Sequence, residues 1–304
     1  MVILTHIGVN LPPYLSDFLE QLRLFNPRID IIFLVNKNNL SHSLFEIYNI
    51  KTHPIEDLEC NIMNTFIDKF GHGDRNSSKK DIKYASTDYW CVAATRLFYL
   101  YQYVKKNGIS NFIHFENDIM IYEDINKILD TIKNNSLYSD KIAMTRASNE
   151  LITTGFMFIS KPENLENLLT DITTYLNDKN SLKDFNRGMI NEMTLINAYH
   201  KRNKEKISNL PILPYGDMSD NYNTFESIFD PATYGQYLDG IPKKPGISII
   251  TDSYIGTELK QDNKNRVIFK EVGGRRIPHL TFNGKLIKIN SLHIHSKRLN
   301  LFSS

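Results

Sequence analysis

The chain has 304 residues, of which 41% are hydrophobic and 23% are charged, and its formal net charge is +2. This length holds one large α/β domain or a main domain with an appendage, and the composition is that of a soluble globular protein rather than a disordered one. A net charge this small gives no general attraction to nucleic acid or to an anionic membrane. We therefore expect no nucleic-acid partner, and any anion must be bound by a local cluster of basic residues.

Cysteine usage and hydropathy set expectations about the compartment. Cys60 and Cys91 are too few for a disulfide framework, and the chain contains no Cys-x-x-Cys. A reducing compartment is the simplest expectation. The apolar run at the N-terminus is too short for a signal sequence, and no apolar run reaches the roughly 18 residues of a membrane span. The sequence predicts a cytoplasmic protein without a transmembrane segment.

Apolar strands and amphipathic helices alternate in the first part of the chain. The expected strands are residues 2–8, 30–35 and 50–55, and the expected helices are residues 14–25 and 40–48. Units of this kind and spacing predict a doubly wound, mostly parallel sheet. Longer helices are expected at residues 58–70 and 89–105. The polar segment 71–81 between them is typical of either a functional lid or a disordered insert.

A short apolar strand at residues 112–115 is followed by two carboxylates, Glu116 and Asp118. Side chains at positions i and i+2 of an extended chain point to the same side. In open α/β sheets, ligands bind at the carboxyl ends of the strands. Two like charges there are unfavourable unless a cation offsets them, and Mg²⁺ or Mn²⁺ prefers carboxylate and phosphate oxygens. The pattern predicts the metal site of an enzyme that acts on a nucleotide diphosphate.

The middle of the chain adds further strands and helices. A helix is expected at residues 123–132, strands at 141–145 and 152–159, and helices at 162–176 and 189–200. Gly155, in the second of these strands, allows either the close approach of a ligand or a bulge. Asn191 and Glu192 fall in the first turn of the last helix. A carboxylate at that position either compensates the helix dipole or acts in catalysis.

The C-terminal part of the chain has a different pattern. Residues 215–246 are rich in Tyr, Asp, Gly and Pro, which is typical of a long structured loop region. Three alternating strands follow from residue 266, with hairpin turns at Gly273-Gly274 and Asn283-Gly284. We therefore divide the chain into a main domain at 1–214, a loop-rich and β-hairpin appendage at 215–288, and a final segment at 289–304 that returns to the metal site.

His293, His295 and Lys297 alternate along that final segment, so an extended backbone places them on one face. Paired histidines at this spacing can ligate a metal, and a lysine on the same face can contact phosphate. Taken alone the pattern is weak, because a surface His-x-His also occurs by chance. Beside Glu116 and Asp118, one imidazole would complete a ligand set for a metal that bridges a diphosphate.

The order of these motifs resembles that of the Asp-X-Asp glycosyltransferases, the nucleotide-sugar-dependent enzymes of the GT-A fold. The matching features are a Rossmann-like N-terminal half, the helix from Trp90 to Arg96, Glu116-Asn117-Asp118 as a variant of Asp-X-Asp, Thr154 to Phe158, Asn191 to Leu195, and the late His-x-His-Ser-Lys. They cover roughly residues 1–215 and the last dozen. The resemblance implies a Rossmann-like α/β fold with a mostly parallel central sheet and a C-terminal β appendage.

The resemblance also implies a role for each acidic and basic position of the motifs. Asp118 corresponds to the direct metal ligand, and Glu116 to the acid that touches either the ribose or the metal. The late metal ligand would be His295, with His293 as the competing choice. Lys297 would bind the diphosphate. The implied cofactor is Mn²⁺ or Mg²⁺.

Other matching positions are implied to bind the donor or to assist the transfer. Those near the nucleotide and the diphosphate are Thr5, His6, Gly8, Asn36 and Arg96, and those facing the donor sugar or the acceptor are Thr154 and Gly155. Glu192 is the implied general base if the enzyme inverts the anomeric centre. The donor would be a nucleotide-diphosphate sugar, with a UDP-sugar favoured over a GDP-sugar. The predicted reaction transfers its sugar to a glycan or polysaccharide acceptor on the side of the appendage, and a homodimer is left open.

Two other functions use similar parts. A sugar nucleotidyltransferase attacks a phosphate instead of a sugar carbon, and it normally has a glycine-rich phosphate loop after the first strand. In this chain Gly8 stands alone at that position, and Pro12-Pro13 follow it. A non-catalytic carbohydrate-binding protein on the same fold is the second alternative, and the 16 Tyr and 17 Phe suit it. The three functions differ in the product released: nucleoside diphosphate from a glycosyltransferase, pyrophosphate from a nucleotidyltransferase, and neither from a binding protein.

Overall fold

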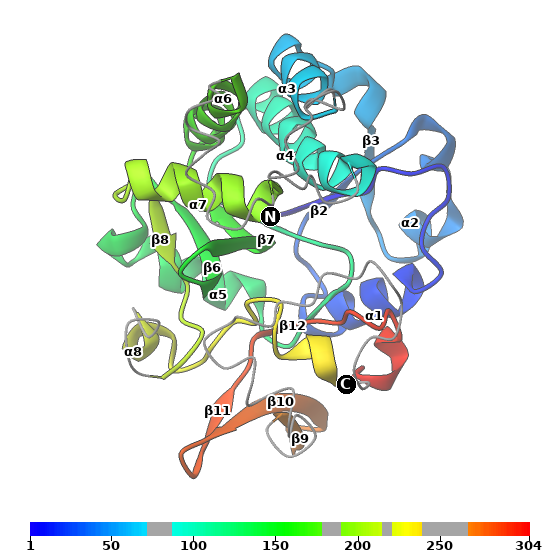
Figure 1. Ribbon diagram of the computed structural model, residues 1–304. Coiled ribbons are helices and arrows are strands. Elements are labelled where there is room, and N and C mark those ends of the chain that lie inside the picture. The colour runs from blue at the N-terminus through cyan, green and yellow to red at the C-terminus, as the bar shows by residue number, and fades with distance from the viewer. Residues whose placement is uncertain (72–86, 178–189, 215–220, 239–266) are drawn as a thin grey trace.

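The computed structural model describes residues 1–71, 87–177, 190–214, 221–238 and 267–304. Within these ranges, a seven-stranded sheet forms the centre of the protein (Figure 1). Its strands, in the order in which they lie side by side, are β3 (Lys51–Pro54), β2 (Ile31–Val35), β1 (Val2–Thr5), β4 (Phe112–Phe115), β7 (Leu151–Ile159), β6 (Ile142–Ser148) and β8 (Ile207–Asn209). Strand β7 runs antiparallel to β4 and β6. All other neighbours in this sheet pair in parallel, so the predicted α/β class with a mostly parallel sheet is confirmed.

Helices cover both faces of the sheet, because side chains along the central strands are apolar on both sides. Val2 and Leu4 of β1 belong to the core of one face, and Ile3 between them belongs to the core of the other. The first face is covered by α1 (Leu15–Phe25), α2 (Ser43–Ile47) and α5 (Ile125–Lys133). The second is covered by α3 (Asn61–Gly71), α4 (Thr87–Asn107), α6 (Pro162–Asn177) and α7 (Glu192–Arg202). The core therefore has two layers with the sheet between them.

Helix α4 leads directly into the strand that precedes the two acids. Its last turn closes through Ile109, whose N–H donates to the carbonyl of Val104 at 2.9 Å. Gly108, with φ of 61°, supplies the left-handed residue that ends the helix and reverses the chain. Strand β4 then crosses the centre of the sheet and ends at Phe115. The buried face of α4 and the end of β4 are thus held in a fixed relation.

The C-terminal appendage is an antiparallel three-stranded sheet, as predicted. It consists of β9 (Val267–Val272), β10 (Arg275–Phe282) and β11 (Lys285–Lys288). The turns lie at the predicted glycines, and Gly273, Gly274 and Gly284 have φ values of 59°, 76° and 74°. Apolar residues of these strands, such as Leu280 and Ile287, are buried in the same cluster as α1 and α5.

The chain after the appendage returns to the central sheet. Strand β12 (Ser291–His293) pairs antiparallel with β5 (Ile119–Ile121), which follows the two acids. The side chain of Leu292, in the middle of β12, is fully buried in the core. The end of the chain is held as well, because Tyr122 donates a 2.7 Å hydrogen bond to the carbonyl of Phe302. The final segment therefore runs beside the turn that carries Glu116 and Asp118.

Two predicted segments lie partly outside the described residues. The polar segment 71–81 lies outside them from residue 72 onward. Of the loop region 215–246, residues 221–238 are described, and they contain the short helix α8 (Tyr222–Phe225). The division of the chain at residues 214 and 288 stays a prediction. In the described part of the chain, no helix has the length and apolarity that a membrane crossing requires.

Replacing Leu292 by Ala should destabilise the whole protein. The side chain is fully buried in strand β12, and its removal leaves a cavity that typically lowers the free energy of unfolding by about 2–5 kcal/mol. Leu286→Ala is the matched control, because this leucine of strand β11 is 40% exposed and should change that free energy by less than about 0.5 kcal/mol. Urea denaturation followed by circular dichroism measures both. If both substitutions lowered the free energy of unfolding by the same amount, β12 would not belong to the cooperative core.

Candidate active site

The two acids lie in a tight turn between β4 and β5. Strand β4 ends at Phe115, and the N–H of Ile119 donates to the carbonyl of Glu116 at 3.1 Å, which closes the turn. The N–H of Glu116 donates to the carbonyl of Gly155 on the neighbouring strand at 3.0 Å. Glu116 and Asp118 therefore converge because the chain turns. Alternation along an extended strand, the reason given by the sequence, is not the cause.

The pairing of β12 with β5 brings His293 beside the acids. His293 Nε2 lies 3.1 Å from Asp118 Oδ2 and 3.7 Å from Glu116 Oε2. One ligand atom from each of these three residues lies within 4.8 Å of the others. The ring of His295 is the next one along, with its centroid 4.5 Å from that of His293. Of the two histidines that the sequence offered, His293 is the one placed with both acids.

These residues fit a divalent cation. Asp118 is 4% exposed, yet its Oδ1 has no hydrogen-bond partner among the described residues, and the same is true of His293 Nδ1. Burial acts to raise the pKa of Glu116, but the charges of Arg96 and His293 outweigh it and hold the pKa well below its usual range. Burial lowers the pKa of His295 to about 3, so that ring is neutral at neutral pH. Ionised carboxylates and an imidazole are ligands that Mn²⁺ accepts.

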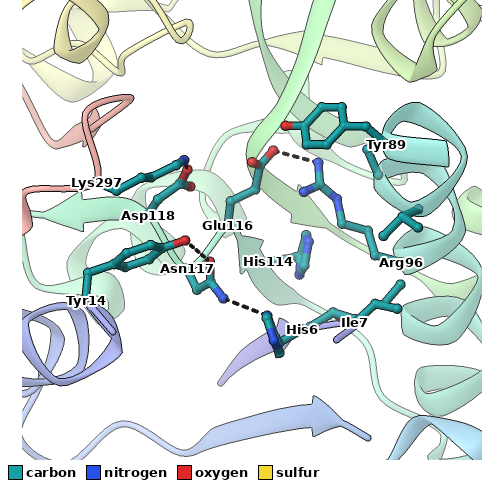
Figure 2. A pocket seen from close by; sticks show the side chains of 13 residues that line it. His6, Ile7, Tyr14, Tyr89, Arg96, His114, Glu116, Asn117, Asp118 and Lys297 are labelled. Carbon is teal, nitrogen blue, oxygen red and sulfur yellow. Dashed lines mark hydrogen bonds and ion pairs between the residues drawn. The ribbon is translucent and has the colours of Figure 1, made fainter. Parts of the chain in front are cut away.

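Two basic side chains flank the acids. Arg96 Nη2 donates to Glu116 Oε1 at 2.6 Å and also to the hydroxyl of Thr154. Lys297 Nζ donates to Asp118 Oδ2. Figure 2 shows Arg96 on one side of the acids and Lys297 on the other. Each carboxylate is thus paired with its own basic side chain.

A cavity of about 230 Å³ opens beside these side chains. The residues that line it come from the end of β1, the start of α1, the face of α4, the acid turn and the final segment, and they include Thr5, His6, Tyr14, Tyr89, Arg96, His114, Glu116, Asn117, Asp118 and Lys297 (Figure 2). Tyr14 and His6 approach Asn117 at 3.4 Å each. Sequence reasoning gave no site role to Tyr14, Tyr89, His114 or Asn117, since none of them belongs to a spacing pattern.

The other residues predicted to bind the donor lie outside the lining of this cavity. Gly8 and Asn36 do not line it, but the N–H of Gly8 donates to Asn36 Oδ1 at 2.8 Å, so they join the loops after β1 and β2. Gly155 lies at a register shift in β7, and a Cβ atom there would come within 2.9 Å of Ile119 Cδ1 and 3.5 Å of His293 Nδ1. The structure thus shows the bulge, and the space beside this glycine is filled by the protein's own side chains.

Glu192 is buried at the start of α7. The helix begins at Glu192, later than predicted, because Asn191 is extended and caps it. Asn191 Oδ1 accepts the N–H of Thr194 at 2.9 Å, and Thr194 Oγ1 accepts the N–H of Asn191 at 3.1 Å. Burial raises the pKa of Glu192 to about 7 against the opposing charge of Arg96, and Glu116 adds to the rise. Glu192 does not line the cavity, but it lies close enough to feel both charges.

Comparisons with known proteins bear on the fold. No protein-family model and no curated protein sequence matches the chain. Similar solved structures include mouse xyloside xylosyltransferase 1, with 9% identity and a TM-score of 0.48 over 69% of this chain and 84% of that one. An active-site variant of the galactosyltransferase LgtC has 9% identity and a TM-score of 0.40 over 83% and 82%. A cytidylyltransferase from Leptospira borgpetersenii has 13% identity and a TM-score of 0.38 over 87% and 94%. Glycosyltransferases thus recur among these similar structures.

Glu192→Gln should change how stability depends on pH. With its pKa raised from 4.5 to about 7, the folded protein holds this proton more tightly than the unfolded chain does, so stability is lost as pH rises between these values. Gln cannot titrate. Relative to wild type, the variant should therefore gain about 2–3 kcal/mol in free energy of unfolding between pH 5 and pH 8. Urea denaturation at both pH values measures this, and an unchanged difference would contradict the protonated state of Glu192.

Proposed function

We propose that the chain is a metal-dependent glycosyltransferase that moves a sugar from a nucleotide-diphosphate donor to a glycan or polysaccharide acceptor. The observation that carries the proposal is the convergence of ligand atoms from Glu116, Asp118 and His293 within 4.8 Å. Arg96 and Lys297 pair with the two acids and line the same cavity. Carboxylates, an imidazole and basic side chains around one cavity are the groups that bind a metal–diphosphate complex.

The nucleotide end of the donor is assigned to the part of the cavity formed by β1 and α1. Thr5 and His6 line it from the end of β1, and Tyr14 adds an aromatic ring beside Asn117. An aromatic side chain with a polar tip offers a stacking surface for a base and a hydrogen bond for a ribose. A UDP-sugar is the favoured donor, and the cytoplasm is the proposed location.

The departing nucleoside diphosphate is the group that needs charge compensation. Glu116, Asp118 and His293 would hold Mn²⁺ or Mg²⁺, which when bound supplies positive charge to the diphosphate oxygens. Lys297 has a side chain that is 45% exposed, so its ammonium is free to turn from Asp118 to a phosphate oxygen. Arg96 is only 14% exposed and stays with Glu116, which keeps that carboxylate ionised.

Glu192 is the proposed general base for an inverting transfer. A pKa of about 7 suits a group that takes a proton from an acceptor hydroxyl at neutral pH, a contribution on the order of 10²–10⁴ in rate. Its Oε2 is buried and has no hydrogen-bond partner among the described residues. Transfer with retention of configuration would need no such base.

Asp118→Asn should abolish turnover and leave the fold intact. The purified chain is incubated with Mn²⁺ and a panel of UDP- and GDP-sugars, and the nucleotide products are separated by chromatography. Wild type should release nucleoside diphosphate, and the variant should lose at least about 10²-fold in rate, because it loses one of the charges that hold the metal–diphosphate complex. Asp140→Asn is the control, since Asp140 pairs with Lys161 on the surface. Pyrophosphate release would instead indicate a nucleotidyltransferase, and silence with every donor would favour a binding protein.

Lys297→Met should bind Mn²⁺ more tightly than wild type when no nucleotide is present. The lysine occupies Asp118 Oδ2, so an ion must displace it, and methionine keeps most of its length without the charge. We expect an affinity gain of about tenfold, which corresponds to about 1.4 kcal/mol, together with weaker binding of a nucleoside diphosphate. Isothermal titration calorimetry measures both. Lys288→Met, which removes one of the two basic partners of Glu123, should change neither. Unchanged Mn²⁺ affinity in Lys297→Met would refute the competition.

A further inference from the structure

The carboxylate of Asp230 is buried, and both of its oxygens accept hydrogen bonds from backbone N–H groups. The residue is 3% exposed. Its Oδ1 accepts the N–H groups of Thr233 at 2.6 Å and Tyr234 at 2.8 Å. Its Oδ2 accepts the N–H groups of Gly235 at 2.9 Å and His293 at 2.8 Å. Each oxygen thus takes two donors, so this carboxylate is committed to the backbone, and it lies outside the set of acids that converge on the cavity.

One of these four donors belongs to the histidine that lies with Glu116 and Asp118. The other three belong to the short segment 233–235, so Asp230 joins that segment to strand β12 at His293. Gly235 also packs against the main chain of this residue, because a Cβ atom there would overlap the carbonyl group of His293. The backbone of His293 is therefore held at its N–H by Asp230 and at its carbonyl by Gly235.

The imidazole of His293 lacks the usual means of orientation. A metal-binding histidine normally donates its second ring nitrogen to a carboxylate or a carbonyl, which fixes the plane of the ring. His293 Nδ1 has no such partner among the described residues. The side chain is 12% exposed and its Nε2 points at Asp118, so the position of the backbone that carries it sets how closely the ring approaches the acids.

We propose that Asp230 is a positioning residue for His293, acting through the main chain to hold the imidazole toward Glu116 and Asp118. This inference rests on the metal site of the proposed function, but it concerns a residue of the loop region and not a ligand. Asp230 sets where the backbone of His293 lies, and Gly235 leaves room for it. Hydrogen bonds from other side chains to metal ligands are typically worth 10–100-fold in metal affinity, and the same range is expected for this main-chain contact.

The test measures the affinity for Mn²⁺ alone, by electron paramagnetic resonance, with the full chain and no nucleotide. Asp230→Asn replaces one acceptor oxygen with an NH₂ group that faces N–H donors, and it should weaken Mn²⁺ binding at least about tenfold. Ser227→Ala is the matched control. It removes the 2.8 Å bond from Asn290 to Ser227, which joins the same loop to the residue before β12 without touching His293, and it should leave the affinity unchanged.

A double-mutant cycle with His293→Ala separates positioning from general destabilisation. If Asp230 acts through His293, then Asp230→Asn should not weaken Mn²⁺ binding further in the His293→Ala background. Wild-type affinity in Asp230→Asn, or the same weakening in both backgrounds, would overturn the proposal. Should Asp230→Asn not fold, Gly235→Ala carries the same test, because it displaces the carbonyl of His293 with Asp230 unchanged.

A second readout keeps this inference separate from the proposed function. The ring ¹⁵N signals of His293 are recorded by NMR in the metal-free protein, and they should shift in Asp230→Asn and stay in place in Ser227→Ala. If wild type binds no Mn²⁺, the metal site of the proposed function fails, and the NMR signals alone decide the role of Asp230. Unchanged His293 signals in Asp230→Asn would then overturn it.

Discussion

The antiparallel pairing of β12 with β5 is the contact on which the rest of the site depends. Its register sets His293 opposite Ile119, directly after Asp118, and the N–H of Ile294 donates to the carbonyl of Asp118 at 3.0 Å. Because side chains alternate along a strand, a slip of one residue would turn His293 away and direct Leu292 toward the acids. The arrangement of the three ligand atoms is thus a property of strand register, which main-chain hydrogen bonds and the buried Leu292 both maintain.

Elements with a strong local signal could be predicted from the sequence. The apolar run at β4, the long helix α4 and the glycine turns of the appendage are examples, because periodicity and turn chemistry specify them without distant contacts. The position of β7 could not be predicted. It lies between β4 and β6 and runs against both, and such an order depends on packing between residues far apart in the chain.

For the candidate site, the sequence predicted the types of residue but not the turn and the strand register that bring them together. Glu116 and Asp118 were recognised as a converging pair, but the cause is a turn that begins where β4 ends. His293 and His295 share a face in any extended segment, so only the register with β5 separates them. Asp230 gave no signal, because it acts on backbone N–H groups and lies in a segment without periodicity.

Asp118 and His293 are 175 positions apart in the sequence. Contacts between such distant residues close a long loop, and they form late because the loss of chain entropy precedes the gain from packing. During synthesis, the turn that carries the acids leaves the ribosome long before the histidine and lysine that complete the site. A growing chain therefore cannot complete this cavity, which forms only once the last strand has docked.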